Sequence, residues 1–207
     1  KLPAWQAPEA PALPDAALLR QAADVLLQAR QPGLFVGWGA RGAQAELMEL
    51  AELLQMPVST TLQGLAVFTG DHPLNEGIGF SRSAVPAAQH AFRQCDALLA
   101  VGTRFAEIPT GSFGARVPQA LVHVDIDPEV PGANYPAQVA LVGDAQPVLR
   151  ALLQELRGRK PERSPNTRLQ HQIADDKAVY LDGWLRQGDP ARVNPAAFFA
   201  SLRKQMP

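Results

Sequence analysis

The sequence is poor in cysteine, with a single one, Cys95, among 207 residues. One cysteine cannot form an intramolecular disulfide, so a secreted scaffold held by disulfides is excluded and a reducing, cytoplasmic location is expected. Cys95 follows an expected helix and precedes an apolar run, with no nearby sequence feature that would activate its thiol. We interpret it as a small buried hydrophobic side chain rather than a reactive thiol.

Several other features are missing. No apolar run approaches the roughly 20 residues of a membrane span, so no membrane partner is expected. Lys and Arg total 19 against 20 Asp and Glu, without any basic cluster, which argues against a nucleic-acid partner. The four histidines lie far apart and no G-x-S-x-G motif occurs, so neither a metal site nor a catalytic nucleophile is predicted. The sequence begins at Lys1 without Met, and we expect a truncated start.

The remaining composition is that of a globular protein with one core. Hydrophobic residues make up 46% and charged residues 19% of the sequence, and the length suits one domain with extensions. Four prolines within residues 1–14 predict a linker, and Asp15 is placed to cap the first helix. We expect the main domain to span residues 15–157.

Two further segments follow the expected domain. Residues 158–193 begin with two prolines and several charged side chains, which predict a second linker, and continue into a polar helix over 167–186. Asn194 and Pro195 can open another helix, which carries Phe198, Phe199 and Leu202. We interpret residues 194–207 as the start of a further, truncated domain.

Within residues 15–157, apolar strand-like runs alternate with helical patterns. The strands are expected at 34–36, 58–60, 97–101, 121–125 and 139–142, and helices at 43–54, 84–94 and 145–157 after the one that Asp15 caps. Such alternation predicts an α/β fold, an open, doubly wound parallel sheet with helices on both faces, of the Rossmann-like, nucleotide-binding type.

The sharpest local motif is the G-x-G-x-x-G string over residues 37–42, between an expected strand and an expected helix. Glycines there let the backbone approach a pyrophosphate, although the same residues would also suit a tight strand-to-helix turn. A domain of the NAD-binding type would place Asp or Glu at the end of the second strand, where this sequence has Ser59, Thr60 and Thr61. An NAD-dependent enzyme is therefore disfavoured.

Charged residues follow the later strands. Since the carboxyl ends of parallel strands share one edge, Arg104, Asp125 and Asp144 are expected to face one crevice. Arg104 could pair with a phosphate, and the carboxylates could accept hydrogen bonds from ribose or adenine. The alternative is that the two aspartates cap turns or helices and that Arg104 makes a surface ion pair.

Five segments in order resemble the central domain of acetolactate synthases, which are thiamine-diphosphate-dependent enzymes. The resemblance runs from about Leu18 to Leu156 and rests on residues 32–37, 57–65, 70–74, 95–105 and 123–128. It implies a parent with three domains, of which this chain holds the central one and lacks the pyrimidine-binding and diphosphate-binding ones. No G-D-G metal motif occurs, so thiamine diphosphate and Mg²⁺ would be bound by the parent and not by this chain, which is expected to be inactive alone.

The resemblance also implies a cofactor site. In acetolactate synthases the central domain binds FAD, which takes no net redox part in the carboligation, and the parent is expected to be a homo-oligomer acting on 2-oxo acids. ADP, or no nucleotide in a purely structural scaffold and subunit interface, are the alternatives. The residues implied for the cofactor are Gly37, Gly39, Thr61, Leu62, Gly79, Phe80, Gly102, Thr103, Arg104, Asp125, Ile126, Asp144 and Ala145.

Two short segments depart from the family pattern. Acetolactate synthases typically continue the G-x-R-F motif with Asp-Asp-Arg, where this sequence has Ala106, Glu107 and Ile108. A Met-His pair that typically follows the equivalent of Gly79 is replaced by Phe80 and Ser81. Related decarboxylases and carboligases keep the same fold with ADP or with no nucleotide.

Overall fold

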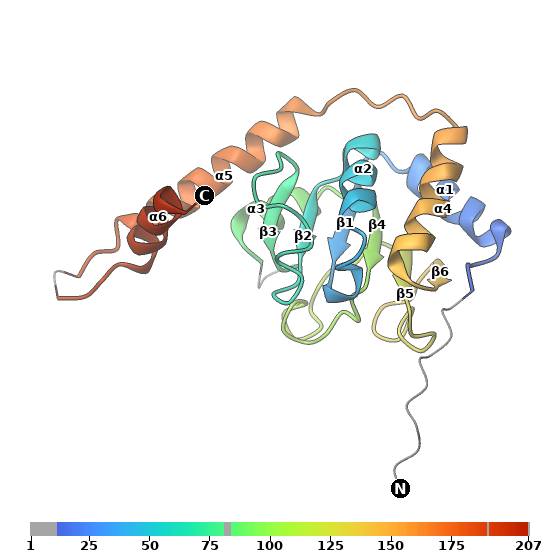
Figure 1. Cartoon of the computed structure of the whole chain (residues 1–207), viewed down its shortest axis with the longest axis horizontal. Coiled ribbons are helices and arrows are strands. Elements are labelled where there is room, and N and C mark those ends of the chain that lie inside the picture. The colour runs from blue at the N-terminus through green and yellow to red at the C-terminus, as the bar shows by residue number, and fades with distance from the viewer. Residues whose placement is uncertain (1–11, 81–83, 190, 207) are drawn as a thin grey trace, which may run out of the picture.

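The computed structural model describes residues 12–80, 84–189 and 191–206. Its centre is a six-stranded sheet (Figure 1), in which the strands follow the order β3-β2-β1-β4-β5-β6 and every neighbouring pair is parallel. The strands are β1 (Pro32–Val36), β2 (Val58–Thr60), β3 (Asn75–Ile78), β4 (Ala97–Val101), β5 (Ala120–Asp125) and β6 (Val139–Val142). The chain order reverses between β1 and β4, which is the point where ligands bind in open α/β sheets.

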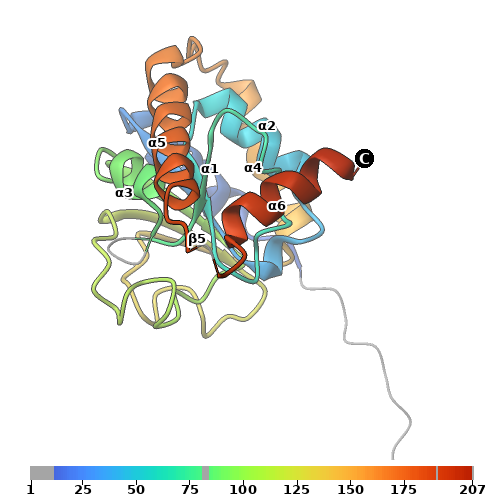
Figure 2. The same cartoon turned by 90° about the vertical axis from the view of Figure 1, so that its left-hand side faces the viewer.

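Strand alternation divides the core into two layers. Leu34 and Val36 face α1 (Ala16–Gln28), α2 (Gln44–Leu54) and α4 (Ala145–Gly158), whereas Phe35 faces α3 (Pro86–Phe92). Figures 1 and 2 show these helices around the sheet, with α5 (Thr167–Leu185) and α6 (Pro195–Gln205) extending past it. The predicted doubly wound α/β fold with helices on both faces is confirmed.

The helix starts follow the local sequence. Asp15 and Asp144 each accept a backbone N–H two residues on, at 2.7 and 3.0 Å, and so cap α1 and α4. Asn166 and Asn194 cap α5 and α6 through the N–H three residues on, both at 3.1 Å. Each cap satisfies a donor that the first helical turn leaves free.

Some expected boundaries were wrong. β3 was not among the five expected strands, because Asn75, Glu76 and Gly77 in this edge strand lack the usual apolar pattern. The helix expected over 84–94 is shorter, and β1 begins at Pro32 rather than Leu34. Within the described residues, no helix combines the length and apolar character of a membrane span.

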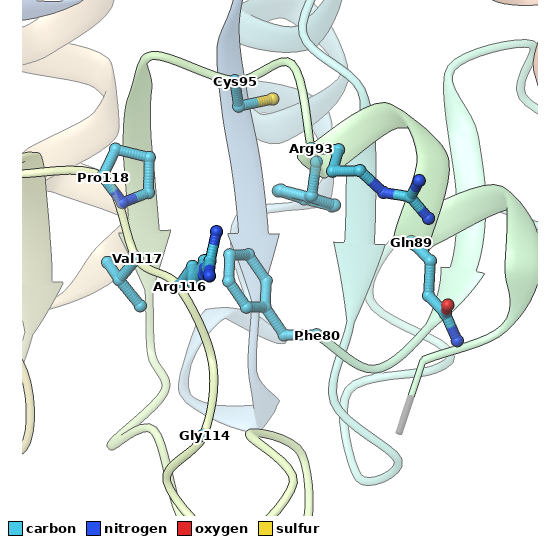
Figure 3. A pocket seen from close by; sticks show the side chains of 9 residues that line it. Phe80, Gln89, Arg93, Cys95, Gly114, Arg116, Val117 and Pro118 are labelled. Atoms are coloured by element: carbon cyan, nitrogen blue, oxygen red, sulfur yellow. The ribbon is translucent and has the colours of Figure 1, made fainter. Parts of the chain in front are cut away.

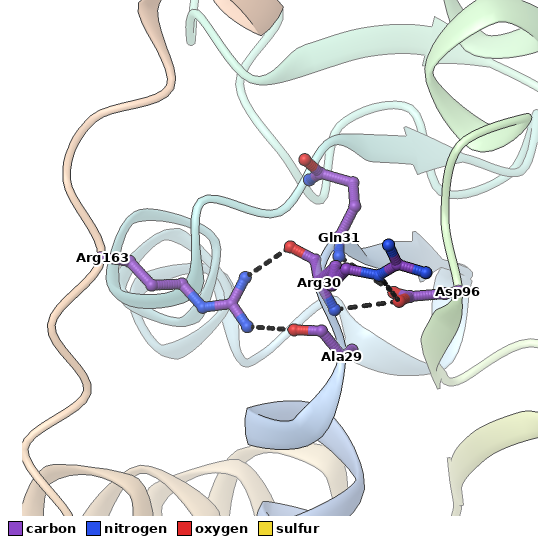
Figure 4. Close-up of polar contacts among 5 residues, drawn as sticks. All are labelled: Ala29, Arg30, Gln31, Asp96 and Arg163. Carbon is purple, nitrogen blue, oxygen red and sulfur yellow. Dashed lines mark hydrogen bonds and ion pairs between the residues drawn. The ribbon is translucent and has the colours of Figure 1, made fainter.

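The segment expected as a second linker is fastened to the domain. The Arg163 guanidinium donates to the carbonyl oxygens of Ala29 and Arg30 at 2.5 and 3.1 Å (Figure 4). The neighbouring Asp96 carboxylate accepts the backbone N–H groups of Arg30 and Gln31, both at 2.9 Å. The corner between α1 and β1 is therefore held from both sides.

We expect Asp96→Ala to lower the free energy of unfolding by roughly 1–2 kcal/mol at neutral pH, a discounted value because the side chain is partly exposed. Although burial opposes it, the backbone N–H groups of Gln31 and Arg30 lower the pKa of the Asp96 carboxyl. This contribution to stability is present above the ordinary aspartate pKa and is lost as the pH falls through the lowered one. Urea denaturation at several pH values should show wild type and variant converging in acid; a constant gap would contradict the assignment.

Candidate functional site

The predicted site residues lie at or just beyond the carboxyl ends of the six parallel strands, along one edge of the sheet. Gly37 and Gly39 follow β1, Thr61 and Leu62 follow β2, Gly79 and Phe80 follow β3, Gly102, Thr103 and Arg104 follow β4, Asp125 and Ile126 close β5, and Asp144 and Ala145 follow β6. The structure places these residues along one edge of the sheet. They differ in which of their backbone and side-chain atoms already have a protein partner.

At the switch point, the turns after β1 and β4 pack backbone against backbone. A Cβ atom added at Gly37 would lie 2.1 Å from the Gly102 oxygen, and one added at Gly39 would lie 2.8 Å from the Gly102 Cα. Gly102 itself has a φ of +60° and leaves no room for a Cβ beside Gly39. These three glycines are required by the contact between the two turns, which is the turn-making alternative stated for the motif.

Several backbone N–H groups at this edge are already used. Gly37 donates to Val101 at 2.9 Å and Gly39 donates to Gly102 at 3.1 Å. Thr61, Gly79 and Gly102 likewise donate to the neighbouring strand ends. Within the part of the chain that the structure describes, the N–H groups of Leu62, Thr103, Arg104 and Ile126 have no protein acceptor. A ligand would be bound by these groups and not by the glycines of the motif.

Arg104 is the cation of this edge. Its side chain is exposed, and among the described residues it makes no ion pair or hydrogen bond. Its backbone is positioned by Asn134, whose Nδ2 donates to the Arg104 oxygen at 2.7 Å. Sequence reasoning missed Asn134, because no motif marks an asparagine thirty residues away. The alternative stated for Arg104, a surface ion pair, is not found among the described residues.

Thr103 is fixed by a buried histidine. His123, in the middle of β5, places Nε2 at 2.7 Å from the Thr103 oxygen. Burial lowers the pKa of His123, although the Thr103 oxygen and Asp125 partly oppose this, so the neutral ring donates through Nε2. Its other nitrogen, Nδ1, is buried and has no partner within the described part of the chain. His123 is therefore a positioning residue for the turn after β4.

The two aspartates have different roles. Asp144 caps α4, and Ala145 is buried behind it, so this end of the edge is mainly structural. Asp125 accepts the Asp127 N–H through Oδ1 at 3.1 Å, in a partly buried position at the end of β5. Its second oxygen has no partner among the described residues, so Asp125 is the carboxylate with a free acceptor.

Three predicted side chains are placed differently from one another. Thr61 is buried, and its hydroxyl accepts the Gly64 N–H at 3.1 Å. Leu62 is exposed, so its side chain offers an apolar surface at this edge. Phe80 is buried against Phe35 and Phe92 and faces the α3 side of the sheet. Phe80 therefore does not bring its ring to the strand-end edge.

An exposed aromatic residue lies within the glycine string itself. Trp38 is 53% exposed, and the Arg41 guanidinium lies 5.2 Å from its ring centroid. Aromatic rings of this kind can stack on flat heteroaromatic ligands. In the sequence, Trp38 stands between the first two glycines of the motif, at a position where the motif itself accepts any residue.

The residues at this edge fit a nucleotide in part. Free N–H groups and the unpaired Arg104 suit a phosphate, and Asp125 and Trp38 suit the rest of a nucleotide. No carboxylate stands at the end of β2, where an NAD site would need one. Among the described residues, no group of three or more potential metal ligands is gathered.

Comparison with known proteins gives a family. Residues 19–152 match the family model described as thiamine pyrophosphate enzyme, central domain. The chain is 40% identical over 141 residues to the probable acetolactate synthase large subunit of Methanocaldococcus jannaschii. The matched segment covers 67% of this chain and 24% of that protein. It is 41% identical over 147 residues to the acetolactate synthase of Mycobacterium bovis, covering 70% of this chain and 24% of that protein. The chain thus spans about a quarter of the length of these relatives.

Proposed function

The chain belongs to the family of thiamine pyrophosphate enzyme central domains, of the acetolactate synthase-like kind, and on that premise we propose that it binds a nucleotide, FAD or ADP, at the strand-end edge. The observation that carries the proposal is the unpaired Arg104 beside the free N–H groups of Thr103 and Arg104. A cation beside two N–H donors without a protein acceptor is an arrangement that suits a phosphate oxygen.

Several neighbouring groups support a ligand of nucleotide length. Trp38 and Leu62 offer exposed apolar surface beyond β1 and β2, and Asp125 offers an acceptor beyond β5. They flank Arg104 along the same edge, so an extended molecule would meet phosphate-binding groups in the middle and other partners on each side. In this proposal the nucleotide serves to hold the strand-end turns together.

The specific observation behind the second candidate function is the packing of Gly37 and Gly39 against Gly102. Because these glycines are used for contact between turns, the edge could be complete without a nucleotide. The domain would then serve as a scaffold and as a subunit interface in a larger protein. Binding of FAD or ADP to the chain separates the two candidates.

For the whole protein, we propose a three-domain parent that joins or decarboxylates 2-oxo acids and forms a homo-oligomer. Thiamine diphosphate, held through Mg²⁺ by other domains, supplies the carbanion chemistry. Residues 15–157 would be the central domain, residues 1–14 and 158–193 its connections, and residues 194–207 the first helix of the diphosphate-binding domain. Support comes from the quarter-length coverage of the relatives and from α6, which has no buried residue. The first eleven residues lie outside those the structure describes.

We expect Arg104→Ala to weaken FAD or ADP binding by roughly ten- to a hundredfold, the factor for loss of one charge-assisted contact of about 1.5–3 kcal/mol. The free energy of unfolding without ligand should change by less than about 0.5 kcal/mol, because the side chain is exposed and unpaired. Calorimetric titration of FAD and of ADP measures the affinity, and urea denaturation measures the stability.

The matched control is Arg20→Ala, which removes an exposed arginine from α1 on the outside of the domain. Its affinity for either nucleotide should equal that of the wild type. Equal affinities of the wild type and Arg104→Ala would remove Arg104 from the site. No binding of either nucleotide to the folded wild type would favour the nucleotide-free scaffold.

A further inference from the structure

A cavity of about 500 Å³ lies on the α3 side of the sheet, away from the edge just described. It opens between α3 and the segment that joins β4 to β5 (Figure 3). The described residues that line it are Phe80, Gln89, Phe92, Arg93, Cys95, Gly114, Arg116, Val117 and Pro118. The volume lies within the usual range for small-molecule sites.

The cavity exists because of how β4 is connected to β5. In a doubly wound sheet, a helix usually crosses over between successive parallel strands and covers one face. Here the connection over residues 102–119 consists of turns, in which Ser112 and Phe113 adopt left-handed φ values of 54° and 60°. The face over Phe35 and Phe80 is therefore covered by α3 on one side and by turns on the other, with the cavity between them.

The floor of the cavity is aromatic and rigid. The rings of Phe80 and Phe92 lie 4.7 Å apart between centroids, and Phe80 also packs on Phe35 at 5.2 Å. Gly33 lets Phe92 and Cys95 lie directly on β1, since an added Cβ would come within 2.8 Å of both. These contacts leave the floor little freedom to collapse into the empty volume.

Among the described residues, the charged side chains that line the cavity are two arginines. Arg93 lines it from just after α3 and Arg116 from the β4–β5 connection, and both are exposed. Over the described ranges neither arginine makes an ion pair, and no Asp or Glu lines the cavity. Two unpaired guanidinium groups above an apolar floor differ from an ordinary surface, where charges of opposite sign are interspersed.

We propose that this cavity is a second binding site, separate from the strand-end edge, for a small amphipathic anion: a flat apolar body with one carboxylate or phosphate group. The apolar body rests on Phe80 and Phe92, and the anionic group lies between Arg93 and Arg116. Guanidinium groups pair with carboxylates and phosphates in the same bidentate manner, so the two head groups share one recognition chemistry.

Cys95, the one cysteine of the chain, lines the cavity and reports on it. Iodoacetate and iodoacetamide alkylate the same thiolate and differ by one negative charge, so the ratio of their rates at one pH measures the local charge. Burial, together with Glu76 and Asp96, raises the pKa of the Cys95 thiol and slows both reagents, but the thiolate fraction cancels in the ratio. Arg93→Gln and Arg116→Gln should each lower the iodoacetate-to-iodoacetamide ratio roughly threefold, the effect of one unit charge several ångströms away in water.

Direct occupancy is measured by protection of Cys95 from iodoacetamide. The probes are 2-naphthoate and 2-naphthyl phosphate, with the neutral 2-naphthamide as comparison. We expect both anions to protect at concentrations at least tenfold lower than the amide, and the double variant Arg93→Gln/Arg116→Gln to remove that preference. Protection by only one anion would assign the head group as carboxylate or as phosphate.

The control Arg20→Gln, on the opposite face of the sheet, should leave the rate ratio and the protection unchanged. Circular dichroism confirms that each variant is folded. Failure of Cys95 to react with either reagent would mean that the cavity is closed and would overturn the proposal. Equal protection by the anions and the amide, or protection that survives in the double variant, would overturn it as well.

Discussion

Gly37→Ala is expected to lower the free energy of unfolding by about 3 kcal/mol or more, because the new methyl group meets backbone and not a movable side chain. The added Cβ would lie 2.1 Å from the Gly102 oxygen and 2.8 Å from the Gly102 carbonyl carbon. Relief requires the turns after β1 and β4 to separate, which stretches the bond from the Gly37 N–H to the Val101 oxygen. Thermal and urea denaturation measure the loss.

The third glycine of the same string is the matched control. An added Cβ at Gly42 meets nothing within 4 Å, and its φ is not left-handed. Gly42→Ala should therefore be neutral or stabilise the domain by about 0.4–1 kcal/mol through the unfolded chain. If all three glycines served only to approach a phosphate, Gly37→Ala would cost ligand affinity and leave the stability of the free chain intact. A Gly37→Ala variant as stable as Gly42→Ala would contradict the packing account.

The contact between these turns explains why the motif could be located from the sequence but not interpreted. A strand, a glycine string and a helix in succession place Gly37 and Gly39 at a strand end. Their partner Gly102 is more than sixty residues further along the chain, and it becomes a neighbour only because β4 pairs with β1. That pairing depends on the strand order, which local patterns do not encode.

The strands themselves were predictable where burial dominates. β4 is apolar at all five positions and buried on both faces, so its sequence alone marks it as a central strand. β3 has four residues, of which Asn75, Glu76 and Gly77 have low strand propensity, and it pairs with β2 on one side only. Tertiary contact and not local preference makes it a strand. Helix caps, in contrast, depend on local sequence and were predictable. Asp15 and Asp144 each accept a hydrogen bond from the backbone N–H two residues further along the chain.

In the candidate site, too, residues marked by local sequence were predictable and residues that act through tertiary contacts were not. Arg104 was identified because it follows a strand end, which is a local property. Asn134 and His123, which hold the turn that carries Arg104, act through bonds that span thirty and twenty residues. Sequence reasoning therefore found the group that meets a ligand and missed the groups that position it.

Glu76 is an acidic residue in β3 whose burial no local sequence pattern predicts. Its replacement is the second change for which we expect a large effect on stability. The side chain is fully buried in β3, and neither carboxyl oxygen has a hydrogen-bond partner among the residues that the structure describes. Burial raises the pKa of Glu76 well above its ordinary value; Lys177 on α5 partly opposes the shift, whereas Asp176 adds to it. The pKa of Lys177 is lowered in turn, by burial, against the attraction of Glu76 and Asp71.

The sign of the pH dependence follows from the raised pKa. The folded chain binds the Glu76 proton more tightly than the unfolded chain does, so this residue favours folding most below the ordinary glutamate pKa. Its contribution is lost as the pH rises through the interval up to the raised pKa of the folded chain. At neutral pH the buried carboxyl therefore opposes folding, and the partly exposed Lys177 offsets part of this cost.

Replacement by a side chain of similar volume should remove this cost. We expect Glu76→Leu to raise the free energy of unfolding at neutral pH by roughly 1–4 kcal/mol, the range found when buried charges give way to packed apolar groups. The gain should shrink as the pH falls below the ordinary glutamate pKa, where Glu76 is neutral in both states. The exposed Glu162, for which Glu162→Leu should change stability by less than about 0.5 kcal/mol, provides the control.

Removing Lys177 tests whether the two charges act as a pair. The Lys177 ammonium also donates to the Gly70 oxygen at 3.3 Å and to Asn75 Oδ1 at 3.5 Å, so it ties α5 to the edge strand. Lys177→Met should destabilise the wild-type chain at neutral pH by about 3 kcal/mol, because the cost of burying the Glu76 carboxyl is then no longer offset by a neighbouring cation. In the Glu76→Leu background the same change should cost about 1 kcal/mol or less, since only those two hydrogen bonds are lost. Equal costs of Lys177→Met in the two backgrounds, measured by urea denaturation, would show that Glu76 and Lys177 are not coupled and that another group compensates the buried carboxylate.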